Sequence, residues 1–89
     1  HNFIDDVYVF EERNKDMELT RYGDILKDNG LEWDTESMKN AYVSNLNAQC
    51  VLALIMGAVR AERFCDGALL DFFTSGCMLK WLERLNSIE

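Results

Sequence analysis

The stretch from Val59 to Leu85 reads VRAERFCDGALLDFFTSGCMLKWLERL and decides the architecture expected of this chain. Apolar residues recur at helical spacing on both sides of Asp66-Gly67, and Gly76 separates two further apolar segments. Asp66 is a suitable N-cap, and glycine accepts the left-handed conformation found at helix ends. We therefore expect three helices here, with a bend at Asp66-Gly67 and a break at Gly76, and structural roles for both glycines.

The helix that leads into this stretch, Ala48–Phe64, is apolar around most of its circumference. A helix of this kind lies at the centre of a bundle. Ala53, Gly57 and Ala61 recur every four residues and form a stripe of small side chains. We expect the stripe to admit the backbone of a second helix, which would offset a mid-helix glycine cost of about 1 kcal/mol.

Upstream of the central helix, apolar spacing predicts helices over about 2–13, 20–28 and 35–42, the last with Thr35 as its N-cap. The cluster Val7–Phe10 would also suit a strand, so both alternatives stay open there. The chain contains no proline and is rich in helix-forming residues. We expect a single all-α domain over residues 1–89, a compact bundle of about five helices around Ala48–Phe64.

The charge of the chain is strongly negative and unevenly distributed. The net charge is −7, and residues 1–44 hold eleven acidic and five basic side chains. Such a surface repels nucleic-acid phosphates and anionic membranes, so we expect no direct contact with either. The longest apolar run, Cys50–Val59, is about half the length of a membrane helix, and no signal-peptide pattern precedes it. We expect a cytoplasmic protein.

Few residues are suited to catalysis or metal binding. The only histidine is His1, so a catalytic triad or a His-containing zinc site has no internal imidazole. No phosphate loop, dinucleotide fingerprint or nucleophile elbow occurs. The three cysteines are widely spaced and apolar in context, which predicts buried reduced thiols; a reactive Cys65, two residues after Arg63, stays open. We expect no enzyme activity, no cofactor and no metal.

Four charged residues lie close together in an otherwise apolar region: Arg60, Glu62, Arg63 and Asp66. We interpret them as an ion-pair and capping network that fixes the bend, with Phe64 also structural. The alternative is that Arg60 and Arg63 contact an anion or an acidic peptide. Trp33 is an aromatic candidate for a binding surface, expected to anchor its loop, while Trp81 is expected in the core and Tyr42 half-buried.

The segment RAERFCDGALL at 60–70 and the segment SGCMLKWLERL at 75–85 resemble an uncharacterised bacterial family, domain of unknown function 6508. The family pattern is R-x-[DE]-R-F-x-[DE]-G-x-L, then a glycine and a closing W/I-L-x-R-L helix. The resemblance covers about the last third of the chain. It implies a small bacterial or mobile-element protein and supplies no activity.

Two functions fit these observations. The first is a non-enzymatic protein–protein interaction module, whose unknown partner could be a second copy of the chain. The second is an acidic inhibitor from a phage or mobile element that mimics nucleic acid, which would require the carboxylates of residues 1–44 to form a continuous stripe.

Overall fold

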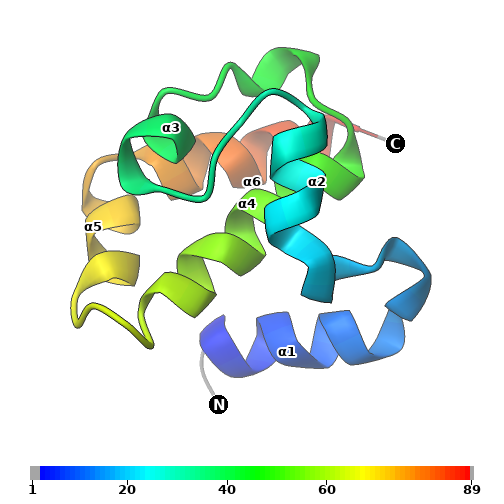
Figure 1. Ribbon diagram of the computed structural model, residues 1–89, viewed down its shortest axis with the longest axis horizontal. Helices are drawn as coiled ribbons and strands as arrows, with labels where there is room; N and C mark the ends of the chain where they lie inside the picture. Colours follow the sequence, from blue (N-terminus) through cyan, green and yellow to red (C-terminus); the bar gives the residue numbers. More distant parts are fainter. Residues whose placement is uncertain (1–2, 89) are drawn as a thin grey trace.

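The computed structural model describes residues 3–88, and the secondary structure within that range is entirely helical (Figure 1). The predicted all-α bundle is confirmed. His1 and the expected helix start at Asn2 lie outside the described residues. The α-helices are α1 Phe3–Arg13, α2 Tyr22–Asp28, α3 Thr35–Lys39, α4 Ala48–Ala61, α5 Ala68–Thr74 and α6 Cys77–Ser87. Single 3-10 turns cover Lys15–Met17, Leu19–Arg21 and Val43–Asn45.

Helix α4 is the buried centre of the bundle, as its sequence predicts (Figure 1). It begins where the side chain of Asn47 accepts a hydrogen bond from the Cys50 amide at 2.9 Å. Helices α1, α2, α5 and α6 all contact it. The aromatic part of the core lies between α5 and α6, where the rings of Phe72 and Trp81 are 5.2 Å apart. Trp81 is buried, as expected.

Helix α4 ends at Ala61, three residues before the predicted end at Phe64. The amide of Phe64 donates to the Ala61 carbonyl at 3.0 Å, so the last turn tightens and the chain leaves the helix axis. It then reverses at Gly67, whose φ of +90° is a conformation that favours glycine. The sequence shows no proline or glycine at 62–64, so periodicity alone extends the helix too far.

The prediction that Asp66 caps the N-terminus of α5 is wrong, because Glu62 caps this helix. The Glu62 carboxylate accepts hydrogen bonds from the amides of Gly67 at 3.2 Å and Leu69 at 2.9 Å. Gly67 occupies the N-cap position and Asp66 makes no capping hydrogen bond. Because α4 ends at Ala61, the Glu62 side chain lies across the bend from these amides and takes the capping role predicted for Asp66.

Two short helices differ in detail from the sequence-based prediction. Helix α3 starts after Asp34, whose carboxylate accepts from the Ser37 amide at 2.8 Å, so Asp34 and not Thr35 is the N-cap. The helix ends at Lys39, and Tyr42 is 74% exposed, not half-buried. In α5, the apolar side chains Leu70 and Phe73 are exposed. Phe72 is buried in their place, since the inward face of this short helix is set by Leu69 and Phe72, three residues apart.

Helix α1 lies along the edge of the bundle and is a helix throughout, so the strand alternative at 7–10 is wrong. None of its residues is fully buried. It contacts α4, and its apolar face packs against the core. The rings of Phe3 and Phe73 form an edge-to-face pair whose centroids are 5.2 Å apart. No helix among residues 3–88 has the length and apolar character needed to cross a membrane.

Candidate functional site

The indole of Trp33 lies directly on the small-residue stripe of α4. Its Nε1–H donates to the carbonyl oxygen of Gly57 at 3.0 Å. A Cβ at Gly57 would lie 3.1 Å from Trp33 Cδ1 and 3.1 Å from the terminal methyl of Met38. At Gly57 the stripe therefore accommodates an indole and a methionine side chain, and not the backbone of a second helix. Trp33 anchors the segment before α3, and the residue as a whole is still 40% exposed.

Trp33 is the centre of a row of three aromatic rings, here called the aromatic row: Tyr22, Trp33 and Phe64. The Trp33 ring meets Tyr22 edge-on at 5.1 Å and Phe64 edge-on at 6.0 Å. Phe64 is 78% exposed, so the structural role predicted for it is not that of a buried core residue. The early end of α4 explains this position, because the turn after Ala61 carries Phe64 out of the core and onto Trp33.

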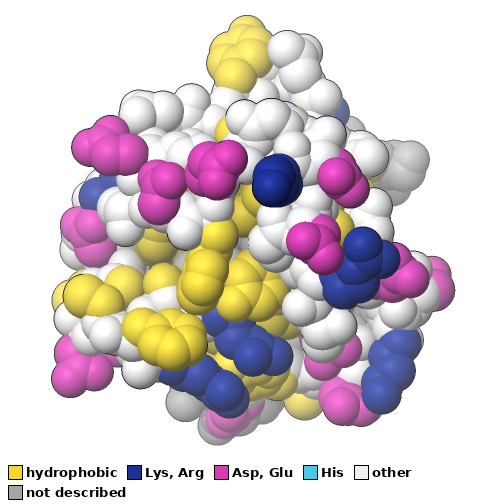
Figure 2. Space-filling view, in the orientation of Figure 1, with side chains coloured by type: hydrophobic (Ala, Val, Ile, Leu, Met, Phe, Trp, Pro, Cys, Tyr) yellow, Lys and Arg dark blue, Asp and Glu magenta, His cyan; other side chains and the backbone are white. Residues whose placement is uncertain are grey.

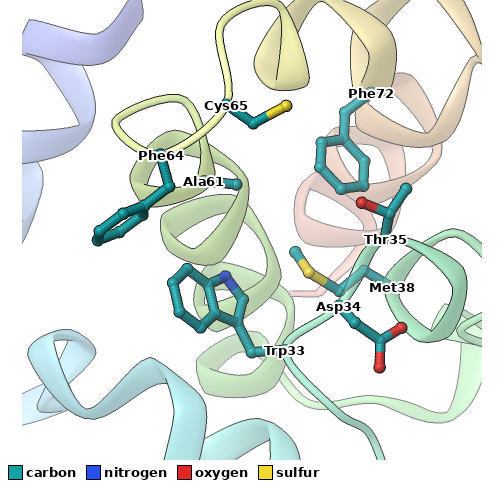
Figure 3. Close-up of a pocket in the computed structure, with 8 residues that line it drawn as sticks. All are labelled: Trp33, Asp34, Thr35, Met38, Ala61, Phe64, Cys65 and Phe72. Atoms are coloured by element: carbon teal, nitrogen blue, oxygen red, sulfur yellow. The ribbon is translucent and has the colours of Figure 1, made fainter.

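A mainly apolar pocket of about 300 Å³ opens beside the aromatic row (Figure 3). Trp33 and Phe64 form one side of it, and Phe72 of α5 and Met38 of α3 face them. The remaining lining residues are Asp34, Thr35, Ala61 and Cys65. The pocket thus brings α3 together with the end of α4 and with α5, both of which come later in the sequence.

Cys65 is exposed and lies at this pocket, whereas Cys50 and Cys77 are buried. The prediction of three buried thiols is therefore wrong for Cys65, and the reason is again the early end of α4. All three cysteines are free thiols. Burial raises the pKa of the Cys50 thiol above its ordinary value.

Arg60 and Arg63 converge on one aromatic ring of α1. Each guanidinium carbon lies 5.5 Å from the centroid of the Tyr8 ring. The ion-pair network predicted around these arginines is not formed, since the ion pairs found in residues 3–88 involve other cations. The intervening acid, Glu62, is engaged at the α5 N-terminus, and those amide hydrogen bonds, first that of Leu69, lower the pKa of its carboxyl group.

Hydrophobic side chains gather over α4 and the segment before α3 on the face shown in Figure 2. Lys and Arg side chains border this area toward α1, whereas Asp and Glu side chains are dispersed over the rest of the face. Of the predicted binding residues, Trp33 lines the apolar pocket, whereas Arg60 and Arg63 lie against the Tyr8 ring and are not among the lining residues. Asp66 is exposed and outside the pocket lining.

The structure adds residues that the sequence did not single out, above all Tyr8 and Tyr22. Tyr8 belongs to the apolar face of α1, a signal available in the sequence, but its contact with the arginines depends on how α1 docks on α4. In the part of the chain that the structure describes, no three His, Cys, Asp or Glu side chains are grouped to hold a metal ion.

The comparison with known families identifies the group to which this chain belongs. A family model described as "Family of unknown function (DUF6508)" matches residues 23–89. The chain belongs to this family. The DUF6508 match starts well upstream of the resemblance at 60–85 and includes α3 to α6, all but the first residue of α2, and every lining residue of the pocket. Helix α1, with Tyr8, lies before it. No curated protein and no solved structure matches the chain.

Proposed function

We propose that this DUF6508 protein is a non-enzymatic protein–protein interaction module that binds an apolar side chain of a partner in the pocket beside Trp33 and Phe64. The observation that carries the proposal is the exposure of Phe64, 78% of whose surface is open to solvent next to a mainly apolar pocket. Aromatic residues are enriched in interface cores, and contiguous exposed apolar surface marks interaction sites.

The size and polarity of the pocket support a side chain as its occupant. Pockets for drug-sized ligands range from about 300 to 1,000 Å³, and this one, at about 300 Å³, is at the lower limit. Its one carboxylate, Asp34, already accepts the Ser37 amide as the α3 cap. Cys65 has no histidine among the lining residues to act as its base. These features favour binding over catalysis.

The charge of the chain favours a different protein as partner over a second copy. Two molecules of net charge −7 repel one another at every ionic strength below full screening. Nucleic-acid mimicry has less support, because the carboxylates on the face shown in Figure 2 are dispersed. In addition, three carboxylates of residues 1–44, those of Glu12, Glu18 and Asp24, lie within ion-pair distance of Lys15 or Arg21.

The test compares Phe64→Ala with Tyr42→Ala, a matched control that removes an exposed aromatic ring outside the pocket lining. Immobilised wild-type protein and both variants are used to recover partners from the native host, and the recovered protein is then purified and its affinity measured. We expect Phe64→Ala alone to weaken the complex, by about tenfold or more if Phe64 is a hot spot. Equal affinity for all three proteins would reject the pocket as the binding site.

Self-association is measured separately by sedimentation velocity of the purified chain at high concentration. We expect a monomer. A dimer that Phe64→Ala dissociates and Tyr42→Ala leaves intact would instead assign the aromatic row to contact between two copies.

A further inference from the structure

The two arginines on Tyr8 contact its aromatic ring and form no ion pair with an acid of residues 3–88. The chain holds 16 acidic and nine basic residues, so an arginine has many potential partners. Arg21 pairs with Glu18 and Asp24, and Arg84 donates to the Leu46 carbonyl at 2.9 Å. No carboxylate of residues 3–88 lies within 4.0 Å of Arg60 or Arg63.

A second observation concerns the hydrogen bonding of Arg60. Its Nε is buried and has no hydrogen-bond partner within the described part of the chain. Folded proteins leave few buried donors unsatisfied, and those that remain call for an explanation. Here the guanidinium is held against the Tyr8 ring by cation–π attraction, at the expense of a hydrogen bond that would satisfy its inner nitrogen.

The shared ring also holds both guanidiniums in place. A guanidinium fixed against an aromatic face loses less side-chain entropy when it binds a ligand than a freely rotating one does. Each offers several N–H donors in a planar fork, the arrangement that matches the oxygens of a carboxylate or phosphoryl group. Glu62, the acid between them in the sequence, is occupied by the Gly67 and Leu69 amides and cannot serve as an internal substitute.

We propose that Arg60, Arg63 and Tyr8 form an oxyanion-binding site, which takes a carboxylate or phosphoryl group presented by a partner protein next to the side chain that enters the pocket. The source of the anion rests on the function proposed above; the site itself does not. Phe64 follows Arg63 directly and lines the pocket, so one short segment of a partner can reach both. Nucleic acid is a poor source of the phosphoryl group, because a net charge of −7 repels its backbone.

The test uses blocked peptides that differ at one position: acetyl-Leu-Glu-amide, acetyl-Leu-phosphoserine-amide and the uncharged acetyl-Leu-Gln-amide. Inorganic phosphate serves as a probe that has no apolar side chain. The full chain, labelled with nitrogen-15, is titrated at low ionic strength while the Nε–Hε signals of its arginines are followed by NMR. We expect saturable shifts of the Arg60 and Arg63 signals with the two anionic peptides and phosphate, and none with the glutamine peptide.

The tighter of the two anionic peptides identifies the source as a carboxylate or a phosphoryl group. Arg63→Gln removes an exposed arginine and is expected to weaken anion binding about tenfold or more. Arg21→Gln, which removes an arginine already paired with carboxylates, is the matched control and should leave the affinity for the anionic peptides and for phosphate unchanged. Tyr8→Leu is expected to weaken binding too, because both guanidiniums lose the ring that orients them.

Three results would overturn the proposal: no saturable shift with any anion, equal shifts with the glutamine peptide, or anion binding that survives Arg63→Gln. The Phe64→Ala variant separates this proposal from the function proposed above. It should retain phosphate binding at Arg60 and Arg63 even if it no longer binds a partner. The anion-site proposal can therefore be tested even if the pocket does not bind a partner side chain. The pocket proposal can likewise be tested even if the arginines bind no anion.

Discussion

Replacing Gly57 by alanine tests the close contact between Trp33 and α4. In the middle of a helix, an exchange of Gly for Ala would ordinarily stabilise a protein, by about 0.5–1 kcal/mol. At Gly57 the new methyl group would meet Trp33 Cδ1 and the Met38 methyl, both at 3.1 Å, and Trp33 Nε1 at 3.3 Å. Met38 can shift its flexible end, but Trp33 is also held by its hydrogen bond to the Gly57 carbonyl.

The expected magnitude follows from three opposing contributions. Helix propensity favours alanine by about 1 kcal/mol. Moving the indole removes one hydrogen bond, at a net cost of about 0.5–1.5 kcal/mol. Overpacking costs a further 1–3 kcal/mol or so. The balance is a destabilisation of about 0.5–3.5 kcal/mol for Gly57→Ala, with the indole displaced away from α4.

Gly23→Ala is the matched control, since a Cβ at Gly23 meets no atom within 4 Å in helix α2. We expect it to be neutral or stabilising by up to about 1 kcal/mol. The free energy of unfolding is measured by urea titration, followed by far-UV circular dichroism, and the environment of Trp33 by its indole N–H signal in NMR. If Gly57→Ala stabilised the fold as much as Gly23→Ala and left the Trp33 signal unmoved, the close contact would be refuted.

Two further predictions concern Glu62 and Cys65. The amide hydrogen bonds from Leu69 and Gly67 lower the pKa of Glu62 below its ordinary value of 4.5. The stabilisation they provide is therefore complete above about pH 4.5 and lost as the pH falls through the lower folded-state pKa. Wild type should have a higher urea midpoint than Glu62→Gln at pH 7, and the difference between the two midpoints should shrink towards pH 3. A difference that is the same at pH 3 as at pH 7 would show that the ionised Glu62 carboxylate is not the source of the stabilisation. Because Cys65 is exposed and Cys50 and Cys77 are buried, a thiol reagent should modify one cysteine per folded chain. It should modify none in the Cys65→Ser variant. Modification of two or three cysteines before unfolding would refute the burial of Cys50 and Cys77.

Periodicity was sufficient to predict the all-α fold and the central position of α4, because its apolar residues extend around nearly the whole helix. The same periodicity failed at the end of α4. Nothing in the sequence at 62–64 marks a helix end, and the deciding interaction, Glu62 with the α5 amides, depends on a tertiary bend. Once α4 ends early, the exposure of Phe64 and Cys65 follows, and neither could be predicted from composition.

Part of the candidate site was within reach of sequence reasoning. The residue types of Trp33, Arg60 and Arg63 single them out as candidates, since such residues recur in recognition surfaces. Their partners were not predictable, because Tyr8 and Tyr22 come from helices whose docking is set by tertiary packing. The small-residue stripe is visible in the sequence, but a stripe specifies only that some group approaches α4 closely. That Trp33 and Met38 are the groups that do so is a property of the folded chain.

The lack of any fully buried residue in α1 has a consequence for the dynamics of the protein. Backbone amides exchange with solvent through the lowest-energy opening available to their segment, and a helix attached only by partly buried side chains opens without the rest. The amides of α1 should therefore exchange as one group, faster than those of α4, while the core around Trp81 stays closed. The protein would then have two levels of cooperativity, a core that unfolds globally and an N-terminal helix that detaches and rebinds within the native state.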